Sequence, residues 1–576
     1  MEGCEMANVT ETTDKTPKKI ITVVMALANK MMNKLRFKER INEKVEWDKD
    51  HWGISPGGLA KAVVLSTLTE IRTPLTHIQE RLRPYDLSYL IGEEAENNDI
   101  NSFNVGRALE RIGEADYNEI YEETALASLQ QYDVPVERIH SDTTTVSFYG
   151  EYETENLGLT EEEQEELLKI EEGYNKDGRP GSKQIVVGQI ATNQGIPITS
   201  KALDGSTSDV EWNKKSLDYL DTLRAKGFEH GTYVADSKLV NQELIERMND
   251  RENKIPFVSR CPANFDEKLE SRTIEKAYNT GNWQSLGQLG EGKNASSYKG
   301  QSFTEQVFGN PMRLLVLESS TLAMKAEETL KKEKEKLTPL IKTMEKKVFA
   351  CREDAEKEYE RFLALKEMKL FESTVEIQEI KTEKWPKGRR NASKPPTIIE
   401  TYQIRITEVK QAEEASRKYI RNESCFVIIS NITDETTTDR EILETYKGQY
   451  AVENSFRQLK GPNLASVIYL KNPARIQALT MILSFSLLIR ALIQHRLRVG
   501  LKKYNEENPG KPIYAGWNNR ELKAPTFKLL HEQTANCYYE NTNSGEYNFI
   551  WSYVEAKYIV RSLLSLMEET IASIMV

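Results

Sequence analysis

The hydrophobic pattern of the first part of the chain is helical. Between Ile21 and Tyr132, apolar residues recur at helical spacing, with breaks at Ser55-Pro-Gly-Gly58 and at Arg83-Pro84. Ser55 followed by Pro56 predicts a helix N-cap and a proline in the first turn. We expect a polar, disordered tail at 1–20 and a helical domain after it. Such a domain could place a helix in a DNA groove or could serve dimerisation and packing, and the pattern leaves both open.

The pattern then becomes that of short strands. After Val136, apolar residues fall in short runs bounded by turn signals such as Asn193-Gln-Gly195. The expected strands are Val136–Phe148, Gln184–Thr192, Ile196–Leu203, Gly231–Ala235 and Ile255–Arg260. The expected helices are Val210–Lys226, Asn241–Asn249 and a short acidic surface helix within Thr160–Glu172. Alternating strands and helices predict an α/β domain.

A long insertion follows before the pattern resumes with an expected strand at Cys425–Ser430. Within the insertion, Ala323–Phe371 is rich in both Lys and Glu and is helical in pattern, with an interruption expected at Pro339. Mixed charge of this kind is typical of a solvated helical hairpin or a short coiled coil. The most apolar run of the chain, Ala478–Ile493, is short of a membrane span and predicts a buried core helix. A terminal amphipathic helix is expected at Val554–Met575.

One segment of the insertion has a different composition. Lys381–Lys394 places six cations around Trp385 in a turn-rich stretch, among them Lys387, Arg389 and Arg390. Cations interleaved with an aromatic ring suit a DNA backbone and an unstacked base. An exposed loop between two strands explains the same composition equally well.

Composition changes this picture little. The net charge of −11 over 576 residues argues against a uniformly basic nucleic-acid-binding surface, but local basic stripes govern phosphate contact. The five cysteines contain no Cys-x2-Cys pair, so we do not expect a structural zinc site. We expect the protein to be in a reducing compartment. The polar start of the chain lacks an apolar signal core. We expect a soluble intracellular protein.

The segment Tyr446–Lys460 carries the most informative polar pattern. At about 100° per residue, Tyr446, Gln449, Glu453, Arg457 and Lys460 would share one face of a single helix. Two aspartates in strand-end settings lie far upstream: Asp142 in His140-Ser-Asp-Thr-Thr-Thr and Asp236 in Tyr233-Val-Ala-Asp-Ser-Lys238. Two strand-borne aspartates and a helix-borne glutamate suit phosphoryl transfer with divalent cations.

The order and flanks of these acids resemble DDE transposases that have an RNase H-like catalytic core. More narrowly, Tyr446, Glu453 and Lys460 match the Tyr-x2-Arg-x3-Glu-x6-Lys signature of the insertion-sequence-4 superfamily, and Gln449 stands at its arginine position. Met32–Ala115, together with the blocks Gly173–Pro180 and Gly205–Asp209, looks closest to the insertion-sequence-1634 branch. The resemblance covers residues from about 25 to about 498.

The resemblance implies a fold and a site. The fold is α/β: an RNase H-like core with an N-terminal helical domain, a large insertion before the last catalytic helix and a helical C-terminal region. The implied catalytic and metal-binding residues are Asp142, Asp236 and Glu453, holding two Mg²⁺ or Mn²⁺ ions per site, with Asp142 bridging both. The implied DNA-binding residues are Tyr446, Gln449, Arg457, Lys460, Lys238, Trp385, Lys387, Arg389 and Arg390.

Each acid also has a structural interpretation. Asp142 could simply begin a strand, Asp236 could cap the next helix, and Glu453 could pair with Arg457 on the helix surface. His140 is better explained as a buried or supporting histidine than as a metal ligand. Four further carboxylates are weaker candidates for the site: Glu151, Asp204, Asp209 and Glu211. For Asp209 we expect a supporting role.

The sequence therefore predicts a prokaryotic, cytoplasmic transposase that associates with the nucleoid when bound to DNA. It would cleave the two ends of an insertion sequence and join the 3′-OH to target DNA, as a homodimer and without a membrane. The alternatives are a transposase-derived DNA-binding protein without catalysis and a metal-dependent nuclease without strand transfer. The expected domains are a tail at 1–20, a helical domain at 21–132, core parts at 133–261 and 423–503, an insertion at 262–422 and a C-terminal region at 504–576.

Overall fold

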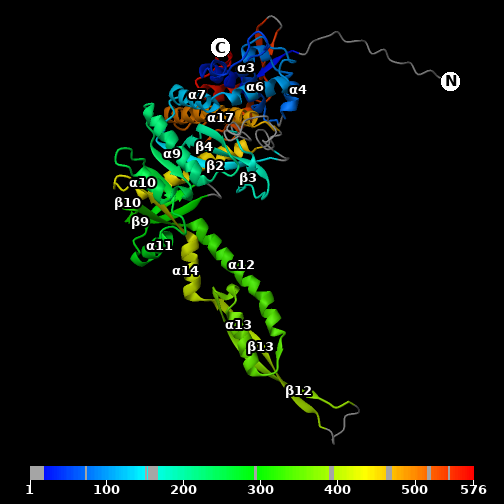
Figure 1. Cartoon of the computed structure of the whole chain (residues 1–576), viewed down its shortest axis with the longest axis vertical. Helices are drawn as coiled ribbons and strands as arrows, with labels where there is room; N and C mark the ends of the chain where they lie inside the picture. Colours follow the sequence, from blue (N-terminus) through cyan, green and yellow to red (C-terminus); the bar gives the residue numbers. More distant parts are fainter. Residues whose placement is uncertain are drawn as a thin grey trace, which may run out of the picture. The chain divides into compact units, whose positions relative to one another are not determined.

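A computed structural model describes residues 18–71, 74–148, 152, 167–290, 295–387, 395–461, 470–515, 520–542 and 545–576. Most of the expected acidic helix, Glu151, Arg389 and Arg390 lie outside these residues. The fold is mixed α/β, and the chain divides into two compact units. The first unit contains Met1–Leu239 and Lys447–Val576, and the second contains Val240–Tyr446 (Figure 1).

The first unit begins with the expected helices. They are α1 (Val23–Lys34), α2 (Phe37–Lys44), α3 (Pro56–Thr67), α4 (Ile78–Leu82), α5 (Leu87–Ile91), α6 (Ser102–Glu114) and α7 (Tyr117–Gln131). Ser55 caps α3 as predicted, because its Oγ accepts a hydrogen bond from the Gly58 amide at 3.0 Å. The break expected at Arg83-Pro84 follows the end of α4.

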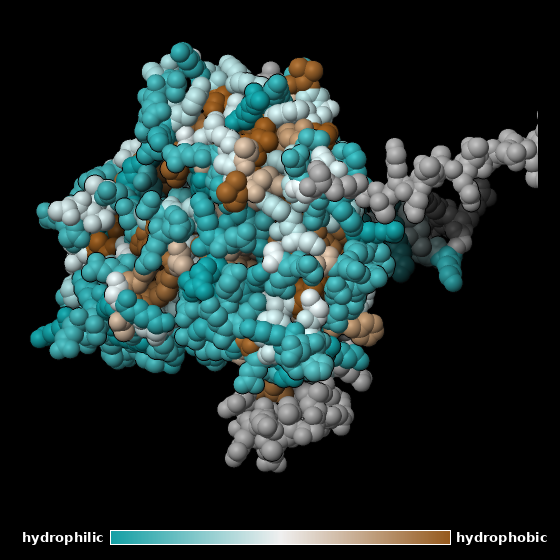
Figure 2. Space-filling model, turned by 90° about the horizontal axis from the view of Figure 1, so that it is seen from above, coloured by the Kyte–Doolittle hydropathy of each residue, from teal (hydrophilic) through white to brown (hydrophobic). Residues whose placement is uncertain are grey.

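The longest helix of the first unit is α17 (Pro473–Glu507), which packs against α3, α6 and α7 (Figure 1). Among the described residues it is the one helix long and apolar enough to cross a membrane, but 89% of its most apolar window is buried within the protein. This agrees with the core helix that the sequence predicts at Ala478–Ile493. The face drawn in Figure 2 is mostly hydrophilic, and its hydrophobic residues form small separate patches.

The C-terminal part of this unit differs from the prediction. The terminal helix α19 covers Ala556–Leu566 only, and a 3-10 turn follows at Ser573–Met575. The helix stops because Glu568 adopts a left-handed backbone conformation (φ 57°), which reverses the chain. The helix α18 (Phe527–Thr534) precedes the last two strands of a small antiparallel sheet, whose first strand lies near residue 20. The strands of this sheet are β1 (Ile20–Thr22), β15 (Tyr538–Asn541) and β16 (Tyr547–Ile550), in that order.

The main strands of the first unit follow the predicted ranges closely. They are β2 (Arg138–Ser147), β4 (Lys183–Thr192), β5 (Pro197–Leu203) and β6 (Thr232–Ala235), with a short β3 (Glu171–Glu172) beside β4. Their order is β5-β4-β2-β6; β4 is antiparallel to both β5 and β2, whereas β2 and β6 are parallel.

Helices cover both faces of β2. On one face, Trp212 of α9 (Asp209–Ala225) donates its indole N–H to Ser141 Oγ at 2.9 Å. On the other face, the ring of His140 lies against Gly448, just before α16 (Tyr450–Leu459). Because neighbouring strand residues point to opposite faces, Asp142 shares the His140 side, the side that α16 covers.

The second unit contains the helix α10 (Gln242–Met248), the helix α11 (Leu269–Thr280) and an antiparallel set of strands. Their order is β7-β14-β10-β9-β8, with bounds Phe257–Arg260, Cys425–Ser430, Asn310–Ser319, Ser296–Val307 and Gln284–Leu289. The strands β7 and β14 were both predicted. Part of the expected insertion, β8 to β10, therefore belongs to the same set of strands as β14.

The charged helical stretch of the second unit also differs from the prediction. The helix α12 (Ser320–Glu345) continues through Pro339 and packs along α14 (Glu413–Ser424). Leu330, Leu337 and Met344 are buried at seven-residue spacing, so the helix packs on the same core on both sides of the proline. The helix α13 (Arg352–Leu363) instead packs on the hairpin of β12 (Phe371–Lys384) and β13 (Thr397–Gln411), which also pairs with a short β11 (Val348–Phe349). The last helix of this unit is α15 (Asp439–Lys447).

Candidate active site

Asp142 and Asp236 lie side by side in the first unit. The parallel register of β2 and β6 pairs Arg138 with Thr232 and His140 with Val234. Continuing this register by one more pair of same-facing residues places Asp236 next to Asp142, at the spacing of adjacent strands, about 5 Å. Asp142 therefore lies within β2 and does not begin it, and Asp236 follows the last residue of β6.

The two carboxyl groups share an electrostatic environment that disfavours charge. Burial is the main cause that raises the pKa of Asp142, and the nearby Asp236 and Asp209 also raise it, whereas Lys176 and the Thr143 amide lower it; the net pKa is about 6. Burial also raises the pKa of Asp236, as does Asp209. Two buried acids with raised pKa values destabilise the folded protein when they are charged. Such pairs are therefore typical of functional sites.

Lys176 provides the positive charge in this cluster. Its Nζ lies 3.7 Å from Asp142 Oδ1 and 2.9 Å from Asp209 Oδ1, and it donates to Thr143 Oγ1 at 2.7 Å. Asp209, the first residue of α9, also accepts a hydrogen bond from Thr143 Oγ1 at 2.5 Å. Asp209 thus supports the pair, as expected. The sequence interpretation missed Lys176, although it lies in the block Gly173–Pro180 that carries part of the family resemblance.

Asp236 also makes a local hydrogen bond. Its Oδ1 accepts a hydrogen bond from the Lys238 amide at 3.1 Å, at the start of the 3-10 turn Ser237–Leu239. It does not cap the next α-helix, because the N-cap of α10 is Asn241, whose side chain accepts from the Leu244 amide at 3.1 Å. The Lys238 side chain is exposed near this turn, and its contact with DNA stays a prediction.

The position of Glu453 is set by both ends of α16. At the start, Gln449 Nε2 donates to the Ser141 carbonyl at 3.2 Å, one residue before Asp142. At the end, Lys460 Nζ lies 2.5 Å from Asp177 Oδ1, one residue after Lys176. Glu453 lies between these anchors on the exposed surface of the helix. It makes no ion pair with Arg457, and both residues are described, so the simple surface-pair interpretation is not supported.

The structure does not assemble three acids into a metal site. Among the residues that it describes, no three Asp, Glu, His or Cys side chains are grouped closely enough to hold a metal ion. It brings together Asp142 and Asp236 and leaves Glu453 outside this pair. The assignment of Glu453 as a third ligand stays a prediction.

The prediction that five polar residues share one helix is wrong. The helix α15 ends at Lys447 and α16 begins at Tyr450, so Tyr446 and Glu453 lie on different helices. The break occurs at Gly448, where a Cβ atom would lie 2.7 Å from His140 Cε1. The Tyr446 ring lies 6.0 Å from the ring of Phe426 in the second unit.

The remaining candidates are scattered. The Arg457 guanidinium lies over the ring of Tyr450, 5.6 Å from its centroid. Trp385 directly follows β12 in the second unit, where its Nε1 donates to Glu383 at 3.2 Å, and Lys387 is exposed nearby. Their contact with DNA is untested.

The weaker candidates have local roles. Asp204 accepts a hydrogen bond from the Lys169 amide at 2.8 Å, and Glu211 pairs with Lys215 at 3.0 Å on the exposed surface of α9. His140 is fully buried, and burial lowers its pKa to about 4, so it is neutral at physiological pH. This agrees with a supporting histidine.

The raised pKa of Asp142 predicts a pH-dependent stability change. Between pH 3.8 and about 6 the folded protein keeps a proton that the unfolded chain has lost, so the free energy of unfolding falls as pH rises through this window. Asp142→Asn removes this cost and should stabilise the protein by about 1–3 kcal/mol at pH 7.5, with little change at pH 4. Urea unfolding at both pH values measures this difference. Glu211→Gln is the control, and an equal effect of Asp142→Asn at both pH values would contradict the assignment.

Comparisons with known proteins cover the chain unevenly. Residues 20–126 match a domain of unknown function, DUF4277. No curated protein matches the chain. One solved structure with a detectable likeness is a cryo-EM structure of piggyBac transposase in a synaptic complex with hairpin DNA, at 9% identity and a TM-score of 0.37, covering 96% of this chain and 83% of that one. A likeness at this TM-score establishes neither a common fold nor a common activity.

Proposed function

We propose that the protein is a metal-dependent DNA transposase of the DDE type. The observation that supports this most directly is the proximity of Asp142 in β2 to Asp236, which directly follows the parallel strand β6. Both acids have raised pKa values, and Lys176 lies beside Asp142. The strand order β5-β4-β2-β6 is in keeping with an RNase H-like core, and the signature around Glu453 favours the insertion-sequence-4 superfamily. The match to DUF4277 assigns no activity by itself.

The donor set of the pair fits Mg²⁺. Mg²⁺ prefers oxygen ligands and is held in many enzymes by one or two carboxylates, with water and substrate phosphate completing its shell. Asp142 and Asp236 would hold it, and Glu453 would join when DNA brings α16 into its working position. When bound, the metal would neutralise charge on the phosphate and favour an ionised attacking oxygen. The chain itself keeps the two carboxylates adjacent and limits their exposure to water.

Lys176 should compete with this metal. Its ammonium group lies where a cation would be attracted, so Lys176→Gln should tighten Mg²⁺ binding several-fold at pH 8, on the order expected for a screened like-charge contact. Because Lys176 also lowers the pKa of Asp142, the variant should lose metal binding at a higher pH than the wild type. Titration calorimetry at pH 8 and pH 6 measures both effects, with Lys169→Gln as the control. Weaker binding at pH 8 would show that Lys176 assists the metal.

The proposed substrates are the two DNA ends of a mobile element and a target duplex. Paired ends require two active sites, so we propose a homodimer. The proposed location is the cytoplasm of a prokaryotic cell, at the nucleoid when DNA is bound.

A strand-transfer assay tests the proposed function. It uses the full chain, Mg²⁺, labelled duplexes carrying both ends of the element that encodes it, and a target plasmid. A transposase cuts the 3′ ends and joins them to the plasmid. Cutting without joining would indicate a nuclease. Binding without cutting would indicate a DNA-binding derivative, for which Gln449 at the arginine position is the specific observation in favour.

A further inference from the structure

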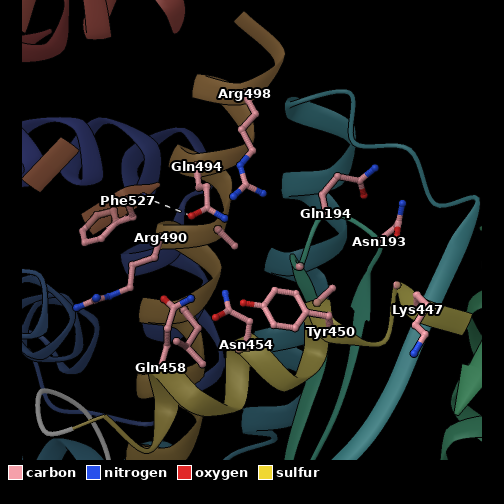
Figure 3. Close-up of a pocket in the computed structure, with 16 residues that line it drawn as sticks. Asn193, Gln194, Lys447, Tyr450, Asn454, Gln458, Arg490, Gln494, Arg498 and Phe527 are labelled. Atoms are coloured by element: carbon pink, nitrogen blue, oxygen red, sulfur yellow. Dashed lines mark hydrogen bonds between the residues drawn. The ribbon is translucent and has the colours of Figure 1, made fainter. Parts of the chain in front are cut away.

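A polar cavity lies behind the helix that carries Glu453. It has a volume of about 220 Å³ and lies between α16, α17 and the turn Asn193–Gly195, all within the first unit. Tyr450, Asn454 and Gln458, each four residues apart, line it from α16. In Figure 3, Arg498 of α17 extends toward Tyr450, whereas Gln494 Oε1 accepts a hydrogen bond from the Phe527 amide at 3.4 Å. The cavity therefore lies on a different face of α16 from Glu453.

Two residues that line the cavity have buried polar atoms without a hydrogen-bond partner among the described residues. These atoms are Oγ of Ser455, which is 5% exposed, and Oε1 of Gln194. Arg490 also lines the cavity, but its side chain extends away from it in Figure 3, pairs with Glu70 and donates to the Thr67 carbonyl. Leaving a buried polar group unpaired costs about 1–3 kcal/mol. Ser455 and Gln194 therefore have unused hydrogen-bonding capacity in the cavity wall, which a bound ligand would engage by turning these side chains.

The lining chemistry limits which ligand fits. Among the described residues that line the cavity, five carry side-chain amides and none is acidic. Arg498 and Lys447 add positive charge, whereas the charge of Arg490 is already paired with Glu70. Asn and Gln amides can form paired hydrogen bonds with the edge of a nucleobase, and a cation can bind a phosphate. The aromatic ring of Tyr450 can stack on a base. The volume is below the roughly 300–1,000 Å³ of pockets for drug-sized ligands, so one nucleotide is the largest unit that fits.

We propose that this cavity binds a single nucleotide. The nucleotide is either free or an unpaired position of a DNA strand. The amides contact the edge of the base, and Arg498 contacts the phosphate. The second of these sources, an unpaired position of a DNA strand, rests on the proposed function. An unpaired nucleotide bound here would contact α16, the helix that also carries Glu453. The basic loop around Trp385 belongs to the other unit and is a separate prediction.

The test measures binding to the full chain in EDTA, so that it does not depend on metal or cleavage. The ligands are the four deoxynucleoside 5′-monophosphates, the matching nucleosides, inorganic phosphate, and short labelled single strands with and without one abasic position. The variants are Asn454→Leu with Gln458→Leu, the shape-preserving Asn454→Asp, and Gln131→Leu as an exposed control on α7. Circular dichroism and thermal unfolding establish that each variant is folded.

We expect at least one monophosphate or base-containing strand to bind, with a loss of about tenfold or more in the double variant and none in Gln131→Leu. Asn454→Asp should weaken the monophosphate more than the nucleoside, because its added charge repels phosphate. Binding of monophosphates identifies the free ligand, and binding of strands alone identifies the unpaired position. No binding by the wild type, unchanged binding in both cavity variants, or equal binding of inorganic phosphate would overturn the proposal. A wild type that binds nucleotides but never cuts DNA would overturn the proposed function alone.

Discussion

Replacing Asp142 or Asp236 by asparagine is expected to abolish Mg²⁺-dependent cleavage of end DNA, with a loss on the order of a thousandfold or more. The amide keeps the shape of the side chain but removes the negative charge that attracts the metal. The two positions become neighbours when the register of β2 and β6 is continued by two residues, so either change alone leaves only one carboxylate in the pair. DNA binding should change little, because neither acid attracts phosphate.

The measurement is the rate of strand cleavage on a denaturing gel, with DNA affinity measured separately. Glu211→Gln is the matched control, because Glu211 is an exposed acid on α9 in the same unit. Near-normal cleavage by Asp142→Asn or Asp236→Asn would remove that residue from the site. Glu453→Gln should lose as much activity as these variants if α16 joins the pair on DNA. A small loss of activity in Glu453→Gln would indicate that the site consists of Asp142 and Asp236 without Glu453.

Local signals in the sequence predicted much of the first unit. Strand alternation and turn residues gave β2, β4, β5 and β6, and the Ser55-Pro56 pair gave the start of α3. These signals depend only on the residues of one segment. The same reasoning fails where the structure of a segment depends on its contact with a residue far away in the sequence. The polar pattern of Tyr446–Lys460 is continuous, but the helix breaks at Gly448, where the ring of His140 from β2 occupies the space that a Cβ atom would need.

The candidate site was predictable only in part for the same reason. The sequence placed Asp142 and Asp236 near strand ends, but only the parallel register of β2 and β6 makes them neighbours. Lys176 was missed because it lies in a loop without periodicity, and its role comes from contacts with Thr143 and Asp209. The prediction at Pro339 failed in the opposite direction, because an interruption was expected where the helix continues. The proline is tolerated because buried residues on both sides hold α12 in place.

Arg457→Ala should impair end cleavage by about ten- to a hundredfold. The insertion-sequence-4 signature, which Tyr446–Lys460 resembles, has an arginine at the position of Gln449. An arginine can make charged hydrogen bonds to a phosphate, whereas the neutral amide of glutamine cannot. Gln449 instead donates to the Ser141 carbonyl beside Asp142, so its side chain is used within the protein. Arg457 lies on the exposed surface of the same helix, over the Tyr450 ring, and can supply the missing charge. The salt dependence of DNA binding should fall by about one phosphate contact in Arg457→Ala.

Gln449→Arg provides the opposite test of this compensation. An arginine keeps a donor for the Ser141 carbonyl and adds a charge, so the variant should remain active and its salt dependence should steepen by about one phosphate contact. Affinity for end DNA between low and physiological salt measures the slopes, and Lys226→Ala, an exposed cation after α9, is the control. A different result would favour the DNA-binding derivative: a wild type that binds ends but never cuts them, with cleavage appearing only in Gln449→Arg. In that case Gln449 would be the substitution that inactivated the enzyme, and Arg457 would contribute to affinity alone.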